Sequence, residues 1–469
     1  MKRDVLLLWV LMSTGLCIQG AGLRAGAATS CITPPIGIVI NGGMGSATAR
    51  NIHDDLFARA LVLEDGAVRL AMVVVDTCLV DRPVFDEARQ LIQQHTGIPA
   101  ERVMLSATHT HSAGAVCGAH LSLGDENYRR TIPGHITDAV RGAVNRLAPA
   151  EIAWGSGSLP QHVFCRRLLI KPGVVYTNQL GFTNELAKMN WDSPHAADGE
   201  PAGPTDPEVG VLSVRHTNGT HLALWANYSL HYVGDVGPGD ISADYFGVFA
   251  DRIQELLGAD RQDPPFVGIL CNGTSGDINN IDPKTGSKST GPYTQIRRVA
   301  RDLAGEVIRV ERGLKYRDRV FLRAGWRELP MATRRPTQEE VVKAKAVVAG
   351  RAVGELRTWT DNYAREQILL AEYPAEVSLP IQVFRIGDLA LAAWPSEIFA
   401  VSGLELKRRS PVKPLLNVGL ANGWFGYIPP PEQFPLGAYE TWRMRTSCLK
   451  TRAIPDLLDC FLGLLEETK

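Results

Sequence analysis

The sequence lacks long hydrophobic runs after its N-terminal stretch, and no later segment approaches the roughly 18 consecutive apolar residues of a membrane-spanning helix. It also lacks an excess of either charge, because 49 Lys and Arg residues balance 50 Asp and Glu residues and leave a net charge of −1. This balance gives no electrostatic argument for binding nucleic acid. The CxxC pattern, the Walker-type loop and the strand–G-x-G-x-x-G–helix unit are absent. No sequence signal therefore indicates a zinc ribbon, a thioredoxin-like site or a nucleotide-binding loop.

The N-terminus has the pattern of a secretory signal peptide. Two basic residues precede an apolar stretch over residues 5–16 that is too short for a stable anchor, and Ala25-Gly26-Ala27 fits the small-x-small rule for cleavage. We predict a signal peptide over residues 1–27, a mature chain that begins at Ala28, and a secreted or periplasmic protein. An uncleaved membrane anchor is the alternative interpretation of this stretch.

Cysteines are few and irregularly spaced. Of the eight in the sequence, Cys17 would leave with the signal peptide, and the seven that remain cannot all be paired. Export permits disulfides, and proximity in the sequence favours Cys448 and Cys460 as one bridge. Cys78 and Cys271 lie in apolar, strand-like runs, so we expect them to be buried thiols.

Strand and helix patterns are interleaved along the chain, and several strand pairs are joined by tight turns. Apolar runs with turn signals between them predict hairpins at 58–63/69–76, 211–216/222–228 and 377–386/389–394, and further strands at 103–106, 265–271, 320–328 and 411–418. Helical periodicity extends over 83–96, 128–147, 245–257, 297–310 and, with a break near Gly350, 336–372. Hairpins among helices favour an α/β (α+β) fold of mixed sheets with helices on their outer faces. We expect one large domain over residues 28–469.

The run from Val103 to Ser112 contains the strongest functional signal. An apolar strand pattern ends in His109 and His111, and in an extended strand two residues spaced i and i+2 point to the same face. Two imidazoles at a strand end can hold a metal together, or one can bind the metal while the other moves protons. An ordinary pair of hydrogen-bonded histidines is the alternative.

Further polar clusters interrupt apolar runs at strand ends, which is where sites are usually built. They contain His231, the segment Gly276-Asp277-Ile278-Asn279, Glu397, Tyr427 and Tyr439. Each has a structural alternative. His231 fits a hydrogen-bonded core histidine, Glu397 fits the N-terminus of a helix that begins near residue 398, and the tyrosines fit ordinary loop aromatics.

The order and spacing of these pieces resemble the neutral, non-lysosomal ceramidase family, in its N-terminal catalytic domain. The resemblance runs from Leu56-Phe57-Ala58-Arg59-Ala60 to Glu440. It implies one Zn²⁺ ion bound by two histidines, a glutamate and a tyrosine, which match His109, His231, Glu397 and Tyr427. It also implies catalytic roles for His111, a non-ligand histidine beside the metal, and for Arg166, Tyr439 and the position of Asn279.

The chemistry implied by this set is metal-assisted hydrolysis. Zinc with an open coordination position lowers the pKa of bound water towards about 7, which supplies hydroxide for attack on an amide carbonyl. His111 could then move protons, while Tyr439 and Arg166 could stabilise the oxyanion. The resemblance therefore implies a secreted zinc amidohydrolase that cleaves the linear amide of a ceramide-like N-acyl lipid. Its partner is a small-molecule or lipid amide, with transient contact to a membrane surface left open.

Three departures from the family pattern limit this expectation. The family has serine where this sequence has Asn279, and a proline-rich segment over residues 429–435 lies between the two tyrosines. Full-length family members also carry a C-terminal β-sandwich domain, which this sequence does not include. Two other functions therefore remain open. One is zinc-dependent hydrolysis of an ester, lactone or phosphoester on the same scaffold, and the other is a secreted binding protein without turnover.

Overall fold

The computed structural model describes residues 22–45, 47–190, 200–287 and 289–469. Most of the expected signal peptide, residues 1–21, lies outside the described residues, so the peptide stays a prediction. Within the described ranges, no helix is both long and apolar enough to cross a membrane.

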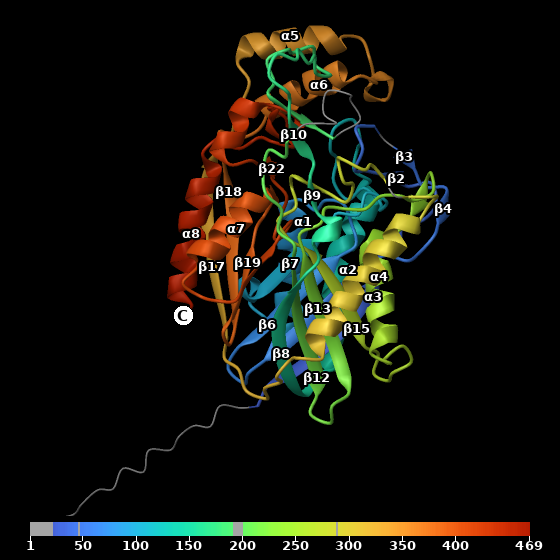
Figure 1. Cartoon of the computed structure of the whole chain (residues 1–469), viewed down its shortest axis with the longest axis vertical. Helices are drawn as coiled ribbons and strands as arrows, with labels where there is room; N and C mark the ends of the chain where they lie inside the picture. The colour runs from blue at the N-terminus through green and yellow to red at the C-terminus, as the bar shows by residue number, and fades with distance from the viewer. Residues whose placement is uncertain (1–21, 46, 191–199, 288) are drawn as a thin grey trace, which may run out of the picture.

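A sheet of eight strands forms the centre of the molecule (Figure 1). In spatial order the strands are β15 (Val267–Asn272), β13 (His221–Tyr228), β12 (Glu208–His216), β8 (Ala148–Ser158), β1 (Arg24–Cys31), β5 (Phe57–Glu64), β6 (Arg69–Val75) and β7 (Val103–Ala107). Neighbours run antiparallel except for two parallel pairs, β13 with β15 and β6 with β7. The sheet is therefore mixed, as the hairpin signals predict.

A second sheet of four strands packs against one face of the first. Its order is β17 (Leu322–Ala332), β18 (Glu376–Ile386), β19 (Leu389–Ala393) and β21 (Leu415–Val418). Apolar side chains from both sheets, such as Leu61, Trp225 and Phe384, share one buried core. Strand β6 is apolar at every position after Arg69 because Met72 faces this core while Val73 faces the helices on the other side.

Helices cover the outer face of each sheet and complete four layers in the order helix, sheet, sheet, helix (Figure 1). The large sheet is covered by α1 (Arg82–Thr96), α2 (Glu126–Asn145), α3 (Asp244–Leu256) and α4 (Thr294–Glu311). The small sheet is covered by α7 (Ala400–Arg409) and α8 (Ala453–Glu467). The α/β (α+β) expectation, with mixed sheets and helices on the outer faces, is confirmed.

A helical pair lies at one end of the molecule, at the top of Figure 1. It consists of α5 (Gln338–Val348), the short η3 (Val353–Glu355) and α6 (Trp359–Ala371). The chain leaves α5 at Gly350, which has φ +70, a conformation that glycine adopts at no steric cost. The predicted break in the 336–372 segment is confirmed.

Short elements complete the fold. The pairs are β2 (Val39–Ile40) with β3 (Ala47–Thr48), β4 (Asn51–Ile52) with β14 (Asp240–Ile241), β9 (Phe164–Cys165) with β16 (Ile278–Asn279), β10 (Arg167–Leu169) with β11 (Ala187–Met189), and β20 (Glu397–Ile398) with β22 (Tyr427–Ile428). Short 3-10 helices are η1 (Ala100–Arg102), η2 (Pro160–His162), η4 (Pro431–Leu436) and η5 (Tyr439–Thr441).

Strand β1 contains residues on both sides of the expected boundary at Ala28. Ala25 and Ala27 are buried, and the strand pairs with β5 from Arg24 onward. The strand escapes pattern analysis because it is built of small residues. A Cβ at Gly26 would lie 2.1 Å from the carbonyl oxygen of Ala143 in α2, so the close approach of this helix requires glycine there.

The cysteine expectations have two outcomes. Cys78 and Cys271 are buried thiols, as predicted. The bridge between Cys448 and Cys460 is wrong, because both are free and every other cysteine in the described residues is free as well. Both lie in the apolar core between α8 and the small sheet, where they pack as small hydrophobic side chains.

Candidate metal centre

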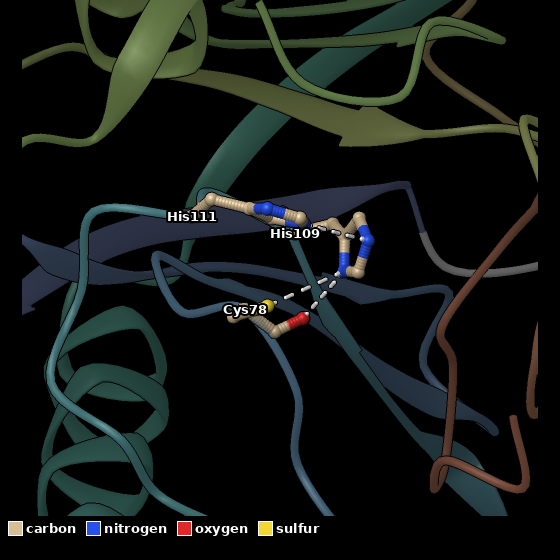
Figure 2. Close-up of side chains that lie close together, drawn as sticks. All are labelled: Cys78, His109 and His111. Atoms are coloured by element: carbon tan, nitrogen blue, oxygen red, sulfur yellow. Dashed lines mark hydrogen bonds between the residues drawn. The ribbon is translucent and has the colours of Figure 1, made fainter. Parts of the chain in front are cut away.

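His109 is positioned by the loop that follows β7. The strand ends at Ala107, so both histidines lie just beyond a strand end, as predicted. His109 has φ +73, an uncommon conformation for a residue other than glycine, and its N–H donates to the Thr77 carbonyl. Its ring Nδ1 lies 2.8 Å from the carbonyl oxygen of Cys78 and 3.8 Å from the Cys78 sulfur (Figure 2). Donation from Nδ1 to that carbonyl turns Nε2 towards the interior of the site.

His231 follows β13 and is held in the same way. Its Nδ1 lies 2.9 Å from the carbonyl oxygen of Ser275, in the loop after the parallel neighbour β15. Its backbone carbonyl accepts from the Asn272 side chain, which also donates to the Thr108 carbonyl. Asn272, the last residue of the edge strand β15, therefore ties the His231 loop to the loop that follows β7, the strand at the opposite edge of the large sheet.

Glu397 comes from β20, beyond the small sheet. Oε1 accepts from the Trp424 indole N–H at 2.9 Å, and Oε2 is buried without a hydrogen-bond partner among the described residues. The helix-cap alternative is wrong for Glu397, because α7 begins at Ala400 and its first N–H donates to Asp277 instead. Asp277 therefore joins the loop after β15 to α7, which is a structural role.

Three ligand-type atoms converge at the meeting point of these loops. Nε2 of His109 lies 3.0 Å from Nε2 of His231 and 3.3 Å from Oε2 of Glu397, and the His231–Glu397 distance is 3.6 Å. All three side chains are buried. With both Nδ1 atoms donating to carbonyls, two lone pairs and a carboxylate oxygen face one another, and the arrangement needs a positive charge.

The pKa shifts of the two histidines also indicate that the site favours a positive charge. Burial lowers the pKa of His109, but Glu397 and Cys78 outweigh burial and hold the pKa well above its usual value. Burial together with the His109 charge keeps the pKa of His231 well below its usual value. A divalent cation would supply the charge that a proton on His109 otherwise supplies, and a donor set of two nitrogens and one carboxylate oxygen suits zinc.

Tyr427 lies beside this cluster. It pairs with Glu397 in the parallel register of β20 and β22, and its ring stacks at 6.5 Å from the ring of His231. Burial and the Glu397 charge raise its pKa well above the usual value, while Arg166, 5.3 Å from its ring, acts in the opposite direction. The structure therefore brings together the four residues expected as ligands.

His111 lies on the cavity side of the cluster. Its Nε2 is 3.2 Å from Nε2 of His109, and its ring stacks on Tyr232 at 3.6 Å. Burial, His109 and Arg166 lower its pKa well below the usual value, so it is a neutral imidazole at pH 7. A neutral imidazole beside the metal position can accept or pass on a proton.

Arg166 also lies in the site, held by a residue that sequence reasoning missed. Glu440 is fully buried and accepts from Nε of Arg166 at 2.9 Å and from Nη1 of Arg167 at 2.7 Å. This anchoring leaves Nη1 of Arg166 3.3 Å from Nε2 of His231, and its Nη2 has no hydrogen-bond partner among the described residues. The adjacency of Glu440 to Tyr439 was the signal in the sequence.

A cavity of about 210 Å³ opens above these groups. Its walls include His111, Arg166, Asn190, Asn279, Tyr427 and Tyr439. The Asn279 side chain donates to Asn190 at 3.3 Å and accepts from the Ile281 N–H, so it forms a polar wall. Sequence reasoning also missed Trp424, Tyr232 and His120, and only Tyr232, next to His231, had a signal in its position.

Comparisons with known proteins agree with this architecture. The profile of the family "Neutral/alkaline non-lysosomal ceramidase, N-terminal" matches residues 24–291, more than half of the chain. The chain therefore belongs to this family. Neutral ceramidase of Pseudomonas aeruginosa is 24% identical over 447 residues, which cover 83% of this chain and 64% of that protein. The chain thus spans less than two thirds of the length of this curated relative.

Solved structures show the same fold. A ceramidase complexed with C2 superposes with a TM-score of 0.72 at 18% identity, covering 95% of this chain and 75% of that one. The crystal structure of neutral ceramidase from Pseudomonas aeruginosa gives a TM-score of 0.70 at 20% identity, with coverage of 95% and 74%. At these identities the likeness carries the fold alone, and activity rests on the chemistry of the site.

Proposed function

We propose that this protein is a zinc-dependent hydrolase that cleaves the amide bond of a ceramide-like N-acyl lipid. The observation that carries the proposal is the convergence of His109 Nε2, His231 Nε2 and Glu397 Oε2 within 3.0 to 3.6 Å. Membership of a family whose characterised relative is a neutral ceramidase supports the choice of bond.

The ligands in this proposal are His109, His231, Glu397 and Tyr427. The Cys78 and Ser275 carbonyls fix both imidazoles with Nε2 inward, and Trp424 occupies the other oxygen of Glu397. Such outer partners orient ligands and raise their basicity. When bound, zinc supplies Lewis acidity and an activated water at neutral pH.

The remaining residues of the site act on protons and on developing charge. His111 is neutral, lies next to the ligands and lines the cavity, so it can take a proton from water and return it to the leaving amine. Arg166 and Tyr439 line the same cavity and can donate to the oxyanion of the tetrahedral intermediate. Asn279 contributes an amide to the cavity wall, where it can contact the polar part of the substrate.

A second candidate is hydrolysis of a different acyl bond, such as an ester or lactone. It is favoured by one observation, the carboxamides of Asn279 and Asn190 that bond to each other in the cavity wall. A carboxamide is larger than the family serine and cannot act as a hydroxyl donor or nucleophile. The export of the protein and transient contact with a membrane surface are also part of this proposal, and both rest on sequence alone.

The test combines elemental analysis of the purified protein with hydrolysis of a fluorescent N-acylsphingosine and a matched ester. One zinc per chain and chelator-sensitive amide cleavage would support the proposal. Zinc with ester cleavage only would favour the second candidate. A chain that binds no zinc after incubation with the ion would overturn the mechanism and leave the fold unchanged.

A further inference from the structure

His120 is a buried histidine that the proposed chemistry does not use. Only 5% of it is exposed, its φ is +55, and it is one of the residues that line the cavity. Its backbone carbonyl accepts from the side chains of Arg365, in α6, and Arg445. Arg445 is itself paired with the buried Glu366 of α6 at 2.7 Å. The backbone at His120 is therefore held from two sides.

Both nitrogens of the His120 ring have partners, and these partners define its tautomer. Nδ1 lies 3.0 Å from the side-chain amide nitrogen of Asn362, and Nε2 lies 2.8 Å from the hydroxyl of Tyr439. An amide nitrogen only donates, so Nδ1 accepts and the ring proton is on Nε2. Nε2 then donates to the Tyr439 oxygen, so the hydroxyl hydrogen of Tyr439 points away from His120. Tyr439 lines the cavity, and Thr446 is the other neighbour of its hydroxyl.

The surroundings keep this arrangement neutral and rigid. Burial lowers the pKa of His120 to about 4, so the ring stays uncharged at pH 7 and keeps a lone pair for Asn362. Trp359 packs edge-on against both rings, 5.7 Å from His120 and 5.8 Å from Tyr439. Trp359, Asn362 and Glu366 are spaced along one face of α6, so the helical pair faces the site with buried polar groups.

We propose that His120, held by Asn362, is a positioning residue that makes Tyr439 a hydrogen-bond donor towards the cavity. Helix α6 therefore belongs to the site, although it contributes no ligand. It lies in the 336–372 segment, for which the sequence predicts a helix and no functional residue. The catalytic consequence rests on the proposed function, because it requires Tyr439 to act on the substrate carbonyl. The hydrogen bonds among Asn362, His120 and Tyr439 do not depend on the proposed function.

The arrangement can be measured without substrate by placing 3-fluorotyrosine at position 439 and recording fluorine NMR of the full chain. We expect His120→Phe to shift the fluorine signal, because the donor to the Tyr439 oxygen is lost. Asn362→Asp is nearly isosteric but only accepts, so it should move the ring proton to Nδ1 and also shift the signal. His221→Phe, at the far end of β13, is the matched control and should leave it unchanged.

Kinetics then test the role in hydrolysis. We expect His120→Phe to lower kcat by about 10- to 100-fold, with KM and zinc content unchanged, because misplacement of one oxyanion donor has effects of this order. His120→Gln should restore part of the rate, since its amide N–H can replace Nε2–H. In a Tyr439→Phe background, His120→Phe should cause no further loss.

Two results would overturn the inference. One is a fluorine signal that is the same in the parent, His120→Phe and Asn362→Asp chains. The other is multiplicative loss in the double variant, which would show that His120 acts independently of Tyr439. If the parent chain hydrolyses no substrate, the proposed function fails, while the fluorine signal still decides whether His120 sets the Tyr439 hydrogen bond.

Discussion

The two halves of the chain, divided here at the end of α4 at Glu311, contribute different chemistry to the site. The first half, which contains the large sheet, provides the nitrogen bases His109, His111 and His231 and the cation Arg166. The second half, which contains the small sheet, provides the carboxylates Glu397 and Glu440 and the phenols of Tyr427 and Tyr439. The nitrogen groups and the oxygen groups of one centre thus come from separate halves, and ion pairs such as Arg166 with Glu440 join the halves across their boundary.

This division explains why the family profile, which ends at residue 291, does not cover the whole site. The carboxylate that faces the two histidines lies beyond the matched residues, in β20. Buried polar contacts, such as Asp277 with Ala400 and Arg166 with Glu440, join the halves in addition to the apolar core that the two sheets share. The following five predictions test whether the two halves form one centre.

The largest effect is expected from removing one ligand on either side of the boundary. His109→Ala and Glu397→Ala should each abolish zinc binding and lower hydrolysis by at least about a thousandfold, with little loss of fold, because a metal needs donors from both halves. Zinc stoichiometry and circular dichroism measure the outcome. Glu405→Ala on the outer surface of α7 is the control. Unchanged zinc content in both ligand variants would contradict the assignment.

Glu440→Gln should cause the next largest effect, on stability. Two buried guanidinium groups, Arg166 and Arg167, would lose their shared carboxylate, and breaking a buried pair typically costs about 3–5 kcal/mol. Urea unfolding measures the free energy. Glu405→Gln, which breaks only an exposed pair with Arg408, should cost less than about 1 kcal/mol. Equal losses in both variants would show that Glu440 does not join the halves.

We expect Asp277, at the boundary between the halves, to make the free energy of unfolding depend on pH. Burial raises its pKa to about 6 from 3.8, against the opposing effect of the Ala400 N–H. A raised folded-state pKa gives stability that is complete below pH 3.8 and is lost as the pH rises through 6. Removal of this titration by Asp277→Asn should therefore raise stability relative to wild type by up to about 3 kcal/mol between pH 4 and 7. A constant difference in unfolding free energy over this range would contradict the prediction.

Tyr439→Phe should have a moderate effect on rate alone. It removes one oxyanion donor of the second half while the ligands stay in place, so zinc content should be unchanged and the rate should fall by at least about tenfold. Single-turnover hydrolysis of the fluorescent N-acylsphingosine measures the rate. An undiminished rate would remove Tyr439 from the mechanism.

The smallest effect is expected from reducing agent. All cysteines in the described residues are free thiols, so no covalent bond among them holds the second half together. Dithiothreitol should leave the thermal midpoint unchanged, as measured by calorimetry under anaerobic conditions. A midpoint that falls on reduction would restore the bridge between Cys448 and Cys460.

The elements that the sequence predicts are those with a strong local pattern. The hairpin of β5 and β6 and the helix α1 follow directly from apolar periodicity and turn residues. Strand β1 could not be predicted from the sequence. Its alanines and Gly26 are small because α2, a segment far away in the chain, packs closely against them. Tertiary packing determines which residues occur in β1, and local strand propensity therefore does not indicate this strand.

The same limit applies to the site. His109 and His111 are apparent from the sequence because they follow a buried strand in one short motif. The φ of His109, its hydrogen bond to the Cys78 carbonyl and the pairing of Glu440 with Arg166 depend on three-dimensional neighbours and leave no local pattern. His120 shows the limit most clearly, because both of its ring partners, Asn362 and Tyr439, are far from it in the sequence.

The location of Glu397 late in the chain also has a consequence for biosynthesis. A ribosome releases His109 and His231 long before it releases the carboxylate that faces them. A nascent or truncated chain can fold much of its large sheet but cannot assemble the three-atom cluster. A metal held by all three atoms would therefore be bound only after both halves have been synthesised and have folded together.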